Sequence, residues 1–140
     1  MQNHFDHLEH IYSIAPIHEF YKGISLIVED GKATIHLEIN SSYFHAGQST
    51  HGSVYFKLLD DAAYFAVQSK VTDKFILTST FNIQLFRPVT KGKIIAQGSV
   101  DLLSRNIFTA SSKLFDEDGK LCAQGTGQFM KSPIDLDKLG

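Results

Sequence analysis

The residues best suited to chemistry are a glycine and an acid eight positions apart, Gly52 and Asp60. The segment 52–70 is rich in Ala, Leu, Phe and Val and has no proline, so it predicts one long helix that begins at Gly52. The first N–H groups of a helix have no partner inside it, and the helix dipole favours negative charge at that end. Gly52 is therefore placed to stabilise a developing oxyanion, although many helices begin after a glycine without such a role.

Asp60 falls at the border of the apolar face of this helix, beside Phe56 and Val67, when the helix is projected at about 100° per residue. A carboxylate in that position is partly removed from water, which raises its proton affinity and suits it to general-base catalysis. Asp61 falls instead on a polar stripe one turn after Lys57, where we expect an ion pair and a solvated surface charge. Packing alone also explains an acid at such a border.

Other patterns are weaker candidates for a site. His4, His7 and His10 recur every third residue, but no Cys or carboxylate is spaced to complete a metal site, so we expect a solvated helix face and no metal. Cys122 lies in a strand pattern and is interpreted as a small buried apolar residue rather than a catalytic thiol. Ser53 lacks the G-x-S-x-G surroundings of a nucleophilic serine.

The elements that carry these residues follow from hydrophobic periodicity and turn signals. An apolar pattern from Phe5 to Tyr12 predicts a short amphipathic helix, and Asp30-Gly31 between two strand-like runs predicts a tight hairpin. Ser49, Thr50 or Ser53 is expected to cap the long helix. The predicted order is a helix at 3–14, strands at 24–29 and 32–39, a loop at 40–51, a helix at 52–70, and strands at 75–85, 93–103, 107–115 and 121–130.

One long helix packed on an antiparallel sheet is an α+β arrangement. We predict a single domain over 1–140, with the N-terminal helix at 3–14, a core at 24–131 and a short C-terminal tail. The helix covers one face of the sheet, so the other face and the edges need cover from elsewhere, and we expect an oligomer.

Composition excludes several classes of protein. The chain is 43% apolar and 20% charged, as in an ordinary globular protein rather than a disordered one. A net charge of −2 gives no reason to expect binding to nucleic acid or to an anionic membrane. One cysteine excludes an intrachain disulfide, and no targeting or membrane segment is visible, so we predict a soluble domain of the reducing cytoplasm.

Several short motifs between His45 and Met130 resemble those of a known family. His51-Gly52-Ser53 resembles a His-Gly-Gly motif, and Leu59-Asp60 follows at the matching spacing. Later matches are Arg87-Pro88, Lys91-Gly92-Lys93 and the run 118–123. This pattern is similar to that of the hotdog-fold acyl-CoA thioesterases related to the phenylacetate-pathway and 4-hydroxybenzoyl-CoA enzymes.

The resemblance implies hydrolysis of an acyl-CoA thioester, with no metal and no cofactor other than the CoA of the substrate. It implies a hotdog fold, in which a curved antiparallel sheet wraps the central helix, and a homodimer that often pairs into a tetramer, with sites between subunits. The N–H of Gly52 would polarise the thioester carbonyl, and Asp60 from the partner subunit would activate water or attack directly. Thr78 would help to hold that water, and His51 and Ser53 would contact the substrate.

Three positions depart from the family pattern. Ser53 replaces the second glycine, His45 stands where relatives often have Asn, and Asp61 places a like charge beside Asp60, which would make Asp60 harder to ionise. His45 could still donate a hydrogen bond to the carbonyl or to water. Cations at strand ends that could bind the CoA phosphates are Arg87, Lys91, Lys93 and, as the best candidate, Arg105.

The sequence leaves open which acyl group is bound and which reaction is catalysed. Aromatic residues that could line an aromatic or medium-chain pocket are Phe44, Tyr55, Phe56, Tyr64, Phe81 and Phe86, although aromatic residues more often form ordinary core. A hotdog dehydratase or hydratase would use His45 or His51 as its base. A hotdog protein that binds acyl-CoA without turnover is the third possibility.

Overall fold

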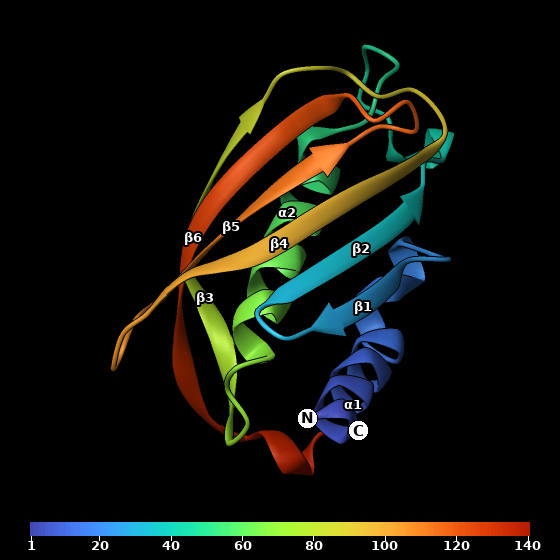
Figure 1. Cartoon of the computed structure of the whole chain (residues 1–140). Coiled ribbons are helices and arrows are strands. Elements are labelled where there is room, and N and C mark those ends of the chain that lie inside the picture. Colours follow the sequence, from blue (N-terminus) through green and yellow to red (C-terminus); the bar gives the residue numbers. More distant parts are fainter.

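The fold is one curved antiparallel sheet wrapped around one long helix, in a computed structural model that describes all residues 1–140 (Figure 1). The strands are β1 (Ser25–Glu29), β2 (Lys32–Glu38), β3 (Lys74–Leu85), β4 (Lys93–Leu103), β5 (Phe108–Phe115) and β6 (Leu121–Asp135). The helices are α1 (Gln2–Ser13), α2 (Gly52–Gln68) and the short 3₁₀ segments η1 (Pro16–Phe20), η2 (Ser41–Tyr43) and η3 (Leu136–Lys138). The predicted elements are thus present, to within a few residues at their ends.

The six strands follow the order β1-β2-β4-β5-β6-β3, and every neighbouring pair is antiparallel. The predicted hairpin is confirmed, because Glu29 pairs with Lys32 across Asp30-Gly31. Gly31 has φ +73°, a left-handed conformation that glycine adopts without strain. The outermost strands are β1, which lies beside α1, and β3, whose outer edge no other element pairs (Figure 1).

Helix α2 lies directly on the inner face of the sheet because small residues meet there. A Cβ atom on Gly98 of β4 would collide with the backbone of Ala62, so only glycine allows this approach. The Ser112 hydroxyl on β5 donates a hydrogen bond of 2.7 Å to the carbonyl of Leu59 and fixes the helix along its axis. Core residues with no exposed surface include Leu58, Leu59, Ile76, Ile94, Leu114 and Phe129.

The outer face of the sheet is polar over its centre. Thr34, Gln97 and Ser111 project there, and the side-chain amides of Gln84 and Gln124 share a hydrogen bond of 2.7 Å. Polar side chains are stable in water, so the centre of this face does not by itself require the cover that we expected. The open edge at β3 is the feature that still favours pairing with another chain.

Helix α1 packs its predicted apolar face on the core, with Phe5, Leu8 and Tyr12 buried. Its other side is less solvated than expected. The Nε2 atom of His4 lies 2.8 Å from the carbonyl of Gln68, and that of His7 lies 2.7 Å from the carbonyl of Leu139. These histidines fasten α1 to its surroundings. No helix is both long enough and apolar enough to cross a membrane.

Strand β6 continues past the predicted end at Met130, into what the sequence indicated as a tail. Lys74 of β3 pairs with Asp135, and the Ser132 hydroxyl donates to the carbonyl of Phe75. Pro133, which lacks an N–H, falls where the register between the two strands shifts, so no ladder hydrogen bond is lost there.

Candidate active site

The start of α2 exposes one backbone donor. His51 is the N-cap, and its Nδ1 accepts a hydrogen bond of 3.0 Å from the N–H of Ser53. The carbonyl of His51 accepts from the N–H of Val54 at 3.0 Å. The N–H of Gly52 donates to no protein acceptor, so it is available to a ligand. The expected capping residues were wrong: His51, which is not among the usual caps, takes that role.

Asp60 is a partly buried acid with one hydrogen-bond partner. The Thr78 hydroxyl donates to its Oδ1 at 2.9 Å, and its Oδ2 accepts no hydrogen bond within the protein. Burial raises the pKa of Asp60 to about 6, and the neighbouring charge of Asp61 adds to this, while the Thr78 bond and Lys57 oppose it. The group is therefore a carboxylate at neutral pH that takes up a proton more readily than an exposed acid.

Gly52 and Asp60 lie on the side of α2 that faces β3. Leu85, at the end of β3, has its Cδ1 3.4 Å from where a Cβ on Gly52 would lie, and Thr78 of the same strand reaches Asp60. Eight residues of helix separate the two groups by about 12 Å. One carbonyl group cannot contact both groups within a single chain.

The same flank exposes apolar side chains beside the free strand edge. Phe56 is 39% exposed, and Leu85 and Phe86 are each about half exposed. The ring of Phe56 meets that of Phe81 edge to face, with centroids 5.5 Å apart. Apolar surface beside an unpaired edge strand is the kind that another protein chain covers.

Asp61 is held on the opposite flank, and the predicted solvated charge is wrong. The predicted pair with Lys57 is present, with Nζ 2.6 Å from Oδ2. The Tyr12 hydroxyl of α1 donates to the same oxygen at 2.7 Å, and the Asp61 side chain is only 17% exposed. Tyr12 of α1 thus covers Asp61, whereas the side chains of Tyr64 and the buried Gln68, which the projection placed on the same stripe, bond to the backbone of β3 and of the turn before it.

His45 lies on the loop before α2, near His51, with the ring centroids 6.5 Å apart. Its Nδ1 accepts from the N–H of Gly47 at 2.9 Å, so its proton is on Nε2, which lies 3.0 Å from the Ser49 hydroxyl. The His45 ring is thus engaged within its own loop.

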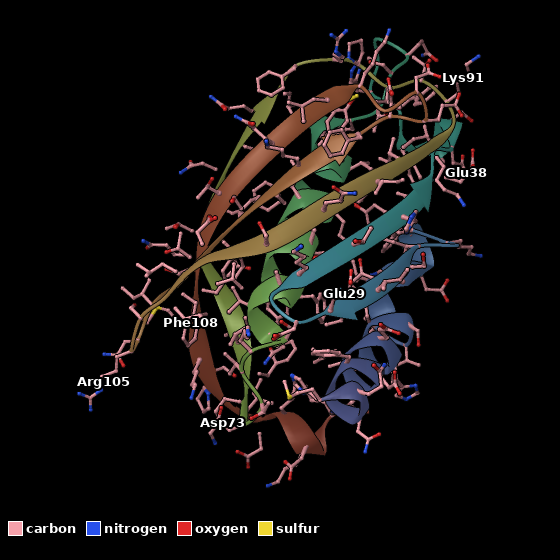
Figure 2. The ribbon with its side chains drawn as sticks, in the orientation of Figure 1. Glu29, Glu38, Asp73, Lys91, Arg105 and Phe108 are labelled. Carbon is pink, nitrogen blue, oxygen red and sulfur yellow. The ribbon has the colours of Figure 1, made fainter.

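The predicted phosphate-binding cations are not brought together. The carbonyl of Arg87 accepts from the Tyr55 hydroxyl at 3.1 Å, which places Arg87 near the first turns of α2. Lys91 lies in the same connection between β3 and β4. Arg105 lies at the tip of the β4–β5 hairpin, at the other end of the molecule from Lys91 (Figure 2).

Two of the six candidate pocket aromatics belong to the core. Tyr55 and Tyr64 are buried, and the Tyr64 hydroxyl donates to the carbonyl of Ile76 at 2.7 Å. Cys122 is also buried, as predicted, with burial as the main cause of its raised pKa. Phe56, Phe81 and the exposed Phe86 are the aromatics near the β3 flank.

Comparison with known proteins adds to this geometry. The model of the thioesterase superfamily matches residues 47–123, a range that contains Gly52, Asp60, Thr78 and Arg87 but not His45. No curated protein matches the sequence significantly.

Solved structures with the same fold include the PaaI protein from the phenylacetic acid degradation operon of Escherichia coli, at TM-score 0.85 and 18% identity over 96% of each chain. A thioesterase from Haemophilus influenzae aligns at TM-score 0.80 and 20% identity over 94% of this chain and 91% of that one. A mutant of PaaI from Thermus thermophilus aligns at TM-score 0.75 and 23% identity, over 84% of this chain and 99% of that one. These similarities confirm the predicted hotdog arrangement.

Proposed function

This chain belongs to the thioesterase superfamily, and on that premise we propose that it hydrolyses an acyl-CoA thioester to the free acid and CoA. The observation that carries the proposal is the state of Asp60, which is partly buried, bonded through one oxygen to Thr78 and open at the other. The free N–H of Gly52 on the same flank of α2 supplies the second group that the reaction needs.

We propose that the working form is a homodimer, which can pair again into a tetramer. Because about 12 Å of helix separates Gly52 from Asp60, one thioester needs groups from two chains. A two-fold axis beside β3 would bring Asp60 of each chain to Gly52 of the other and give two equivalent sites. The unpaired edge of β3 and the exposed side chains of Phe56 and Leu85 support this assembly.

In the proposed reaction, the Asp60 carboxylate removes a proton from a water molecule, and the water oxygen attacks the thioester carbonyl. The carbonyl oxygen becomes an oxyanion and accepts a hydrogen bond from the Gly52 N–H, an interaction worth about 2.7–4 kcal/mol in comparable sites. Collapse of the intermediate expels the CoA thiolate, which takes the proton from Asp60. Direct attack by Asp60, through an acyl anhydride that water then opens, is the other route.

The remaining site residues have supporting roles in this proposal. Thr78 orients the Asp60 carboxyl group and the water, and His51 and Ser53 contact the substrate at the start of α2. His45 would donate a hydrogen bond from its Nε2–H to the carbonyl or the water in place of its present contact with the Ser49 hydroxyl. Arg87, near the first turns of α2, is better placed than Arg105 for the CoA phosphates, and Arg105 would have to act at a site formed with another copy. We place the reaction in the reducing cytoplasm, in keeping with the single free cysteine.

The proposal is tested by incubating the protein with a panel of aromatic and aliphatic acyl-CoAs and measuring release of free thiol. We expect release by the wild type and its loss in Asp60→Asn, with Asp30→Asn, an exposed acid paired with Lys70, as the matched control. A change in enoyl-thioester absorbance without thiol release would instead identify a hydratase. Tight acyl-CoA binding without turnover would identify a binding protein, and either result would overturn the proposal.

A further inference from the structure

Lys57 lies on α2 one turn before two acids, Asp60 and Asp61, and its side chain could reach either of them. It precedes Asp60 by three residues and Asp61 by four, and both spacings bring side chains together on a helix surface. The structure places its Nζ on Asp61, at 2.6 Å. A pair with Asp60 would instead neutralise the carboxyl group that the proposed reaction uses. The choice between the two acids therefore matters for catalysis.

The ammonium group of Lys57 is surrounded by the N-terminal segment. It lies 3.0 Å from Nε2 of His18, and 5.2 Å and 5.5 Å from the ring centroids of Tyr12 and Tyr21, within the range of cation–π attraction. Tyr21 is itself held by stacking on Tyr43, with centroids 5.7 Å apart.

The hydrogen bonds of His18 make it an acceptor for this lysine. Its Nδ1 lies 2.7 Å from the carbonyl of Tyr12, which can only accept, so the ring proton is on Nδ1 and Nε2 is free to accept from Lys57. Burial and the adjacent Lys57 charge both lower the pKa of His18, so the ring is neutral at pH 7.

On the side of α2 that faces β3, no cationic side chain is available to Asp60, so Lys57 is the only cation of the chain that acts on it. Strand β3, which packs against that flank, has no charged residue between Phe75 and Leu85, and Thr78 supplies an uncharged donor. The charges that act on Asp60 are those of Asp61 and Lys57, both on its own helix. The position of Lys57 thus decides whether Asp60 has an ionic partner.

We propose that Tyr12, His18, Tyr21 and Asp61 form a clamp that holds the Lys57 ammonium group away from Asp60, which leaves Asp60 unpaired and able to accept a proton. These four residues are positioning residues, since none of them contacts the reacting atoms. The importance of the clamp for catalysis rests on the proposed function, but its effect on Asp60 does not.

The first test is titration of the Asp60 carboxyl carbon by ¹³C NMR in Asp61→Asn and in Asp61→Asn/Lys57→Met. In Asp61→Asn the released lysine pairs with Asp60, and an opposite charge within reach lowers a carboxyl pKa by about 1–3. Adding Lys57→Met should therefore raise the midpoint by at least about one pH unit. Asp61 is absent from both proteins, so its own charge does not contribute. Midpoints that agree within about 0.3 unit would overturn the clamp.

A second variant keeps every charge of the wild type. Tyr21→Leu removes one aromatic wall, and we expect the Asp60 midpoint to fall by a smaller amount than in Asp61→Asn. The control is Lys70→Met, which removes an exposed lysine paired with Asp30 and should leave the midpoint unchanged. A role confined to stability would lower the melting temperature of Tyr21→Leu without moving the midpoint, and that result would contradict the clamp.

Kinetics then separate the clamp from the proposed function. In Asp61→Asn the acid limb of kcat/KM should move to lower pH, with a loss of up to about tenfold in the plateau rate that Lys57→Met restores. NMR midpoints that shift as expected in a protein without thioesterase activity would overturn the function and keep the clamp. Thioesterase activity with unshifted midpoints would overturn the clamp and keep the function.

Discussion

The two flanks of α2 treat neighbouring acids in opposite ways. Toward α1, Asp61 receives hydrogen bonds from Tyr12 and Lys57 on one oxygen and has little exposed surface. Toward β3, Asp60 has one bond from Thr78, a pKa raised by burial to about 6, and an open second oxygen. The α1 flank gives its acid a cation and a hydroxyl donor, whereas the β3 flank gives Asp60 one hydroxyl and no cation and leaves the Gly52 N–H without a protein acceptor.

This difference shows that the packing element, rather than the residue type, decides which acid is available for chemistry. Two aspartates in sequence differ by about 100° around the helix, enough to face different neighbours. Helix α1 supplies hydroxyl and aromatic groups, whereas β3 supplies one hydroxyl and an unpaired edge. The groups left unsatisfied are the ones that a substrate and a second chain would complete.

The comparison is tested most strongly by replacing each acid with its amide. Asp60→Asn should lose about 10²–10⁴-fold in kcat/KM, the usual contribution of a general base. Asp61→Asn should lose at most about tenfold, because its carboxylate does not contact the reacting atoms and acts on Asp60 only through its own charge and the position of Lys57. Steady-state kinetics with one acyl-CoA substrate measure both. Equal losses would show that the two flanks are not functionally distinct.

The backbone donor on the β3 flank can be removed by one substitution, whose added Cβ would lie in ordinary contact with Leu85. Gly52→Pro deletes its N–H at the first helical position, where proline is well tolerated, and His51 at φ −62°, ψ 144° already has a conformation that suits a residue before proline. We expect a loss of about 10²–10³-fold in kcat. Gly52→Ala, which keeps the N–H, is the matched control and should remain within a few-fold of wild type. A proline variant as active as the alanine variant would remove Gly52 from the mechanism.

Thr78 offers a smaller change with a defined sign. Its hydrogen bond lowers the pKa of Asp60, so Thr78→Val should raise that pKa further and move the acid limb of kcat/KM above pH 6. We expect a loss of roughly tenfold at pH 6 that shrinks as the pH rises toward 9. This shift is opposite to that expected for Asp61→Asn. A limb that moves to lower pH would show that Thr78 does not stabilise the carboxylate.

The two flanks should also differ in the sign of their effect on stability. The pKa of Asp60 is raised in the folded state from 3.8 to about 6, so ionisation of this group lowers the free energy of unfolding. This loss of stability is absent below about pH 4, grows between pH 4 and pH 6, and is complete above about pH 6. Asp60→Asn should therefore raise the free energy of unfolding by about 1–3 kcal/mol at pH 8, with little gain at pH 4. Asp61→Asn should lower it by about 1–3 kcal/mol, because the hydroxyl of the buried Tyr12 loses its charged acceptor. Urea denaturation at the two pH values measures this, and the same sign for both variants would contradict the contrast.

Local patterns were sufficient to predict the elements and the position of Asp60. The periodicity of 52–70 and the projected helix placed that acid at the border of the apolar face, and Asp30-Gly31 located the hairpin. The identity of Thr78 as its neighbour came from resemblance to the family, and the hydrogen bond between them is consistent with that prediction.

The α1 flank could not be predicted, because its contacts join residues far apart in the sequence. Tyr12 and Asp61 are separated by 49 positions, and no local pattern indicates that α1 covers Asp61. The one available signal was the hydroxyl of Tyr12, which needs a partner when its ring is buried. The cap was missed for a different reason, because histidine ranks low among capping residues.

The central claim is that one chain's Asp60 works with the other chain's Gly52, and mixing two inactive variants tests it directly. Asp60→Asn and Gly52→Pro are unfolded together, refolded as an equal mixture, and assayed against each variant refolded alone. Random pairing leaves half of the dimers mixed, each with one intact site, so the account predicts recovery of roughly a quarter of wild-type activity. A mixture no more active than the separate variants would show that the two groups do not meet across chains.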